Sequence, residues 1–258
     1  MRPSLESPAA AKSLNLPATI VVPLSTSPLM VSKLRDLGAQ VHQFGASWAE
    51  ADAHLREVVM RDDAAGVYVP PFDHSDIWAG AATMIDELSV QMDVPVHGIV
   101  CSVGGGGLLN GIMAAVETEG AASLRECVRT GTHATLDSIT SIATSLGARK
   151  VSAKTFEWLA NSNLSSIAVE DWEAAMSCVY FADDARFVVE AACGATLAPA
   201  YFPSPSGTNR LRDAFERLEF PWDEHNVVLV SVYGDIAAAA GSSGAKAKTA
   251  TTNGNHLA

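Results

Sequence analysis

The stretch that decides the fold is Pro95-Val-His-Gly-Ile-Val-Cys-Ser102, which leads through Val103 into four consecutive glycines, Gly104–Gly107. Its first part is short, apolar and rich in β-branched residues, so it predicts a buried strand. The glycines stand at the end of that strand. Because α/β proteins bind their ligands beyond the carboxyl ends of parallel strands, this position predicts a ligand-binding loop.

The four glycines have the chemistry of an anion site. Glycine lacks a Cβ, so its backbone approaches a ligand closely and adopts positive φ angles without a steric penalty. Successive N–H groups, together with the N-terminus of a following helix, attract negative charge. Gly104–Gly107 therefore predicts a phosphate cradle, with a flexible surface turn as the alternative. The loop is neither a Walker motif, since no Gly-Lys-Ser/Thr follows, nor a G-x-G-x-x-G fingerprint in its usual βαβ frame.

The rest of the chain alternates short apolar runs with segments of helical periodicity, which predicts an α/β fold with parallel strands and helical crossovers. Strands are expected at 17–23, 39–44, 66–69, 95–102, 187–190 and 226–231, and helices at 29–37, 47–61, 75–92, 122–130, 152–161, 170–182 and 195–201. Everything beyond Gly241 is small or polar, which predicts a disordered tail.

Composition and charge exclude several classes of protein. Apolar residues make up 48% of the 258 residues and charged residues 18%, which is typical of a folded globular protein. The 17 Lys and Arg against 29 Asp and Glu give a formal charge of −12, so binding to nucleic acid or to an anionic membrane is not expected. We also expect no membrane span and no signal peptide, because no apolar run has the required length or position.

The cysteines indicate a reducing environment. Cys101, Cys127, Cys178 and Cys193 stand far apart, with no C-x-x-C pair and no histidine at metal-ligand spacing. A zinc site is therefore not expected. We predict free, mostly buried thiols and a cytoplasmic location.

Several stretches resemble one enzyme family. Cys101-Ser-Val-Gly-Gly-Gly-Gly-Leu108 resembles the pyridoxal-phosphate (PLP) loop of the L-serine/L-threonine ammonia-lyases, or serine dehydratases, which are tryptophan-synthase-β-like, fold-type-II enzymes. The resemblance covers about residues 13–236, with further blocks in the family's order at 17–23, 68–80, 139–147, 189–195 and 227–231. It implies doubly wound parallel sheets of the PLP fold-type-II kind. It also implies β-elimination of L-serine or L-threonine to pyruvate or 2-oxobutanoate and ammonia, in amino-acid catabolism.

The resemblance implies roles for particular residues. Gly104, Gly105, Gly106, Gly107 and Leu108 would hold the PLP phosphate through backbone N–H groups, and Ser231 would contact the pyridine nitrogen. A neutral hydroxyl at that nitrogen suits β-elimination. Glu117, Ala121 and Leu146 match positions that give oxygens to a monovalent-cation site, although Glu117 taken alone is equally compatible with a solvated carboxylate. A small amino-acid substrate and a homodimer are expected on the same ground.

The chain departs from the family at two points. The family uses a lysine in a Ser-x-Lys-x-Arg-Gly turn to form a Schiff base and to remove the substrate α-proton, and this turn is not present. None of the six lysines, at positions 12, 33, 150, 154, 246 and 248, is expected to replace it, so no catalytic residue is assigned. Ten positions lead from Gly107 to Glu117, too few for a helix and a returning parallel strand. A helix–strand segment near 113–116 is therefore expected to be missing, which makes the fold incomplete.

These observations predict four segments: an N-terminal extension at 1–12, a remnant of the smaller α/β domain at 13–70, a larger PLP-binding domain at 71–241 and a disordered tail at 242–258. Three hypotheses remain open. The chain is a PLP-dependent L-serine ammonia-lyase by descent, truncated N-terminally and carrying an internal deletion. Alternatively it is a non-catalytic remnant that binds an anion or a complete paralogue. The third hypothesis is an incomplete gene model or splice form.

Overall fold

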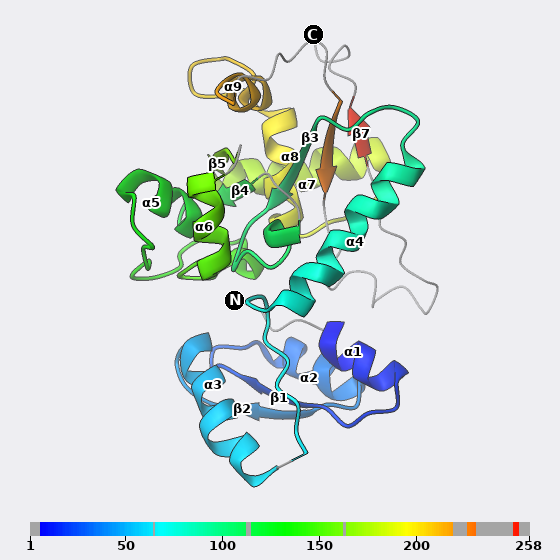
Figure 1. The fold of residues 1–258 in the computed structure, drawn as a ribbon, viewed down its shortest axis with the longest axis vertical. Helices are drawn as coiled ribbons and strands as arrows, with labels where there is room; N and C mark the ends of the chain where they lie inside the picture. The colour runs from blue at the N-terminus through cyan, green and yellow to red at the C-terminus, as the bar shows by residue number, and fades with distance from the viewer. Residues whose placement is uncertain are drawn as a thin grey trace. The chain divides into compact units, whose positions relative to one another are not determined.

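The computed structural model describes residues 6–63, 65–111, 115–161, 164–218, 226–230 and 250–252. The chain divides into two compact units, Met1–Pro71 and Phe72–Ala258, whose elements are labelled in Figure 1. No helix within the described ranges is both long and apolar enough to cross a membrane. The four cysteines are all free thiols, and Cys101, Cys127 and Cys193 are buried.

The first unit is built around a two-stranded parallel sheet. β1 (Thr19–Val22) pairs with β2 (Gln40–Gln43), and α2 (Pro28–Asp36) connects them. α2 begins at Ser27, whose side chain accepts a hydrogen bond from the Met30 N–H, and its apolar face packs with Val22 of β1. The other helical segments are α1 (Glu6–Ser13), α3 (Trp48–His54), the π-helical turn Leu55–Val59 and the 3₁₀ turn Met60–Asp62.

Two expected strands are wrong. Residues 66–69 and 187–190 form no strand, and the side chains of Val67 and Val188 are 85% and 62% exposed. β-branched composition favours a strand only where a neighbouring edge and a buried face are available. Conversely, β5 (Ser166–Val169) and α9 (Arg210–Glu216) were not expected from the sequence pattern.

The second unit contains a five-stranded sheet in the order β5-β4-β3-β6-β7. β3 (Gly98–Ser102), β4 (Ala115–Thr118), β5 and β6 (Val227–Val230) are parallel, and β7 (Ala250–Thr252) is antiparallel to β6. Residues 250–252 fall within the segment 242–258 that is expected to be a disordered tail, and they pair with β6. The rest of that tail lies outside the described residues.

Helices cover both faces of this sheet. Alternate strand residues point to opposite faces and build two separate cores. One core joins Cys101, Ala115 and Val228 to Leu88 of α4 (Ser75–Gln91), Leu124 of α5 (Ser123–Thr130) and partly buried Phe156 of α6 (Ala153–Asn161). The other joins Val100, Val116 and Leu229 to Ala174 of α7 (Asp171–Ala185), Leu197 of α8 (Ala191–Tyr201) and Phe215 of α9. The predicted doubly wound α/β fold is confirmed.

The connection from β3 to β4 is short for a parallel crossover. After the glycine loop the described chain forms a single 3₁₀ turn, Leu109–Gly111, before β4 begins at Ala115. β4 pairs with β3 only from Cys101 onward, whereas β6 pairs with β3 from Gly98 to Cys101. The missing segment is expected near 113–116, of which Ala115 and Val116 belong to β4, whereas residues 112–114 lie outside the described residues.

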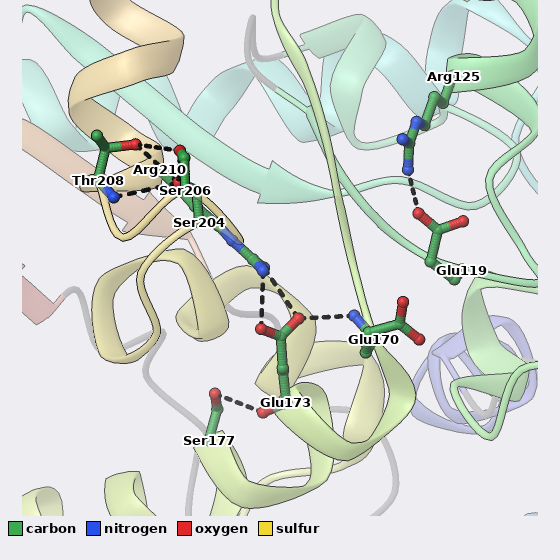
Figure 2. Close-up of polar contacts among 9 residues, drawn as sticks. All are labelled: Glu119, Arg125, Glu170, Glu173, Ser177, Ser204, Ser206, Thr208 and Arg210. Carbon is green, nitrogen blue, oxygen red and sulfur yellow. Dashed lines mark hydrogen bonds and ion pairs between the residues drawn. The ribbon is translucent and has the colours of Figure 1, made fainter.

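A buried ion pair joins α9 to α7. Arg210 donates two hydrogen bonds to Glu173, from Nη1 to Oε2 at 2.9 Å and from Nη2 to Oε1 at 2.8 Å, as Figure 2 shows. Glu173 Oε2 also accepts a hydrogen bond from the Glu170 N–H at 2.8 Å, within the capping box that begins α7. Because both side chains are shielded from water, removing one leaves the other without its compensating charge.

We therefore expect Arg210→Ala to lower the free energy of unfolding by about 3 kcal/mol, since it leaves the Glu173 carboxylate buried and uncompensated. The matched control is Arg125→Ala, which breaks the exposed Arg125–Glu119 pair drawn in the same view (Figure 2). That change should cost less than about 1 kcal/mol. Denaturant unfolding measures both, and equal losses would contradict the assigned role of the buried pair.

Candidate functional site

The glycine loop follows β3 at the carboxyl edge of the sheet. Val103, between strand and loop, is buried, and its N–H donates to the Val116 carbonyl at 2.8 Å. Gly105, Gly106 and Gly107 are buried as well, and Gly106 has φ of +96°. The alternative interpretation as a flexible surface turn is therefore wrong.

Neighbouring groups fill the space that side chains on this loop would need. The backbone of Leu146 lies against Gly104, the ring of Phe72 against Gly105 and Oγ1 of Thr155 against Gly106. A Cβ at position 105 or 106 would overlap Phe72 or Thr155. Only glycine allows the backbone to pass this close to all three neighbours.

The backbone N–H groups of the loop remain available for a ligand. Among the described residues, none accepts a hydrogen bond from the N–H of Gly104, Gly105, Gly106 or Gly107. Two of the loop carbonyls have partners, because Gly105 accepts from the Ser152 N–H and Gly106 from the Asn110 N–H, both at 2.8 Å. Buried N–H groups are nearly always paired, so the loop fits an anion such as a phosphate group.

A closed ring of three side chains supports the loop. Asn110 Nδ2 donates to Ser152 Oγ at 2.9 Å, Thr155 Oγ1 donates to Asn110 Oδ1 at 2.8 Å, and the Ser152 and Thr155 hydroxyls are 2.9 Å apart. Because the Thr155 proton points to Asn110, Ser152 must donate to Thr155, which sets the direction of all three bonds. Such a ring restrains every member and, with them, the loop backbone.

The sequence alone did not indicate these three residues. Ser152 also accepts from the Thr155 N–H at 3.1 Å and so caps α6. A Ser at the expected start of that helix is a capping signal that could have identified it. Asn110 gave no local signal, because its partner lies 42 residues away in the chain.

Gly106→Ala tests the close approach of the loop to Thr155. The matched control is Gly207→Ala, which shares a positive φ of +82° but has open space around its Cβ position. The control should lose about 1 kcal/mol of unfolding free energy from backbone strain alone. Gly106→Ala should lose a further 1 to 3 kcal/mol, roughly, from overpacking. In a Thr155→Ala background, the additional loss of unfolding free energy should be smaller. Equal losses in Gly106→Ala and Gly207→Ala would contradict the close packing of Gly106 against Thr155.

Glu117 lies on β4 and is fully buried, so the interpretation as a solvated carboxylate is wrong. Its carboxylate accepts hydrogen bonds from the Leu124 N–H at 2.8 Å, the Arg125 N–H at 2.7 Å and the Ser166 hydroxyl at 3.1 Å. The first two donors belong to the opening turn of α5, whose N-cap side chain makes no such bond. Burial raises the pKa of Glu117 to about 7, and the hydrogen bonds oppose this shift.

Ala121 and Leu146, the other residues implied for a cation site, lie on segments next to Glu117 and the loop. Ala121 is buried in the turn after β4, and Leu146 ends the 3₁₀ turn Thr144–Leu146 beside Gly104. The Leu146 carbonyl accepts from the Ala148 N–H at 2.8 Å. A carboxylate has about four acceptor positions, of which Glu117 uses three. A cation at these residues stays a prediction.

The raised pKa of Glu117 predicts a pH-dependent stability. Between its ordinary value of 4.5 and about 7, the folded state holds a proton that the unfolded state has released. The stability that Glu117 contributes is therefore present below the lower value and is lost as pH rises to the higher one. Relative to Glu117→Gln, the wild type should lose up to about 1.4 kcal/mol of unfolding free energy for each pH unit in this window. Denaturant unfolding at several pH values measures this; parallel profiles would contradict it.

The remaining expected site residues are placed as follows. Ser231 lies outside the described residues, although Val230 before it pairs with Cys101. Lys12 donates to the Asp36 carbonyl and Lys154 to Glu157, both at 3.1 Å. Lys33 lies on α2 of the first unit, Lys150 is exposed, and positions 246 and 248 are outside the described residues.

A buried glycine loop that follows a central parallel strand and fits a phosphate group is typical of cofactor-binding α/β proteins. The chain matches the family of pyridoxal-phosphate dependent enzymes over residues 8–210 and belongs to that family. The predicted membership of the PLP-dependent enzymes is thereby confirmed.

Its relatives are serine dehydratases. The chain is 37% identical over 218 residues to an L-serine dehydratase of Saccharomyces cerevisiae (strain AWRI1631), covering 75% of this chain and 64% of that protein. It is 41% identical over 205 residues to the human protein called serine dehydratase-like, covering 74% and 62%. A fungal L-serine ammonia-lyase from Rhizomucor miehei has a similar structure, with a TM-score of 0.74 and 34% identity over 89% of this chain and 73% of that chain. The chain thus spans less than two thirds of the two sequence relatives.

Proposed function

We propose that this chain binds PLP through its phosphate group and derives from an enzyme that deaminates L-serine or L-threonine. The observation that carries the proposal is the buried glycine loop. No described residue accepts a hydrogen bond from any of its four N–H groups. The names of the yeast, human and fungal relatives support a hydroxyl-bearing amino acid as substrate. Elimination of the β-hydroxyl as water, followed by hydrolysis of the resulting imine, would give ammonia together with pyruvate from L-serine or 2-oxobutanoate from L-threonine.

The proposal assigns the following roles to residues of the larger domain, 71–241. Gly104–Gly107 and Leu108 hold the phosphate by backbone N–H groups, and the Asn110–Ser152–Thr155 ring keeps these groups in place. When bound, PLP supplies an electron-withdrawing ring that stabilises negative charge on the substrate α-carbon. Ser231 is proposed to contact the pyridine nitrogen. Support comes from Val230 pairing with Cys101, so that β6 ends at the edge where the loop begins.

The proposal also covers a cation site, the first unit, the location and the assembly of the chain. Glu117, with one acceptor position left, and the carbonyls of Ala121 and Leu146 are proposed to bind a monovalent cation. Residues 13–70 are proposed to correspond to the family's smaller domain. The four free thiols support a reducing, cytoplasmic location. A homodimer is proposed from the family alone.

A second candidate function is anion binding without catalysis. It is favoured by the lysines, because Lys12 donates to the Asp36 carbonyl, Lys154 donates to Glu157 and Lys150 is exposed. We therefore expect PLP to bind to this chain without a covalent link.

Equilibrium dialysis with PLP tests the cradle. Gly105→Asp and Gly105→Asn add side chains of the same size against Phe72, but only Asp adds a negative charge to the loop. Wild type should bind PLP and inorganic phosphate competitively. Gly105→Asp should bind at least about tenfold more weakly than Gly105→Asn, because like charges repel in a buried site.

Borohydride treatment of the PLP-loaded protein separates the two candidate functions. The absence of cofactor fixed to any lysine, together with competitive phosphate binding, supports a non-covalent cradle. Cofactor fixed to one of the six lysines, with deamination of L-serine, would show that the chain is itself a complete enzyme. Equal affinity of the Asp and Asn variants would contradict the assignment of the phosphate to this loop.

A further inference from the structure

His133 lies between α5 and α6 in the sequence and hydrogen-bonds to a segment that contacts the glycine loop. Its ring stacks on Phe156 of α6, with the two ring centroids 5.0 Å apart and an interplanar angle of 12°. Its Nε2 lies 2.8 Å from the Val151 carbonyl oxygen. Because a carbonyl oxygen only accepts hydrogen bonds, Nε2 must carry a proton and donate it to Val151. The stack and this bond together fix the plane of the imidazole ring.

The Val151 carbonyl and the Ser152 N–H belong to one peptide unit, and both of these groups are hydrogen-bonded. The carbonyl accepts from His133, and the N–H donates to the Gly105 carbonyl at 2.8 Å. In a trans peptide unit the carbonyl and the N–H point in opposite directions. A chain of hydrogen bonds therefore runs from His133 through this peptide unit to the glycine loop.

The hydrogen-bond chain ends at an N–H group of the phosphate cradle. The Gly105 carbonyl shares its peptide unit with the Gly106 N–H, from which no described residue accepts a hydrogen bond. Glycine on both sides leaves this unit without a Cβ that would restrict its rotation, and Gly106 has φ of +96°. The bond from Ser152 to the Gly105 carbonyl therefore sets the direction of the Gly106 N–H, which points away from Ser152.

We propose that His133 is a positioning residue for the bound phosphate group and acts through the peptide units 151–152 and 105–106. This inference rests on the proposed function, in which the N–H groups of the loop bind phosphate. Hydrogen bonds in a chain polarise one another, so the proton that His133 donates strengthens the bond from Ser152 to Gly105. The Gly106 N–H is thereby held in place and becomes a better donor to an anion.

Other hydrogen bonds keep the His133 segment in position. The Leu136 N–H donates to the Arg149 carbonyl at 2.8 Å, and Arg149 Nε donates to the Leu136 carbonyl at 2.6 Å. These bonds join the segment to the residues before α6 without the imidazole. Loss of the His133 bond should therefore leave the fold intact and change the direction and the polarisation of the Gly106 N–H.

The matched variants His133→Gln and His133→Asn test this role. Both replace the ring by an amide and lose the stack on Phe156, but only the longer Gln side chain carries its amide nitrogen to the position of Nε2. The Gln variant should bind inorganic phosphate within about twofold of the wild type, and the Asn variant about threefold more weakly than the Gln variant. Titration followed by backbone amide NMR measures the affinities. In the phosphate-free protein, the Gly106 amide proton should shift upfield in the Asn variant only.

The wild type provides a second measurement that needs no variant. Coupling between two sites is reciprocal, so phosphate binding should shift the His133 Nε2 resonance together with the Gly106 amide. Equal phosphate affinities of the Gln and Asn variants, or an unchanged Nε2 resonance at saturating phosphate, would overturn the role of His133. A wild type that binds no phosphate would instead contradict the cradle itself, and with it the proposed function.

Discussion

The close passage of the glycine-loop backbone between Phe72, Leu146 and Thr155 is the constraint on which the second unit depends. Each neighbour is held by its own element: the Phe72 carbonyl accepts from Trp78 Nε1 of α4 at 2.8 Å, and Thr155 lies in the first turn of α6. Side chains on the loop would push these elements outward. Four glycines let three elements converge at the end of β3, and the loop N–H groups are thereby left for a ligand.

The two ends of β3 lie in different surroundings. At the carboxyl end, the hydrogen-bond ring of Asn110, Ser152 and Thr155 fixes the loop. At the amino end, Ile99 is one of the residues that line a cavity of about 700 Å³. In the described part of the connection between β3 and β4, one 3₁₀ turn follows the glycine loop. The two cores on the faces of the sheet remain intact around it.

Local patterns predicted the features that depend on local chemistry. A strand followed by glycines identified the loop, and helical periodicity identified α2, α4, α5, α6 and α7 to within a few residues. The sequence-based predictions fail where the structure of a residue depends on another residue that lies far away in the sequence. Residues 66–69 have strand composition but pair with no strand in the described part of the chain, and Asn110 acquires its role from Ser152 and Thr155, far along the chain. Burial of Glu117 likewise depends on α5 packing against β4, which a single carboxylate in a sequence does not reveal.

The central claim is that the N–H groups of the glycine loop bind a phosphate group. Titration of the isotopically labelled protein with inorganic phosphate, followed by backbone amide NMR, tests it most directly. We predict saturable shifts, with one dissociation constant, for the amides of Gly104–Gly107 and Leu108, and smaller shifts for Ser152 and Asn110. Unchanged loop amides at saturating phosphate, or shifts confined to other parts of the protein, would contradict it.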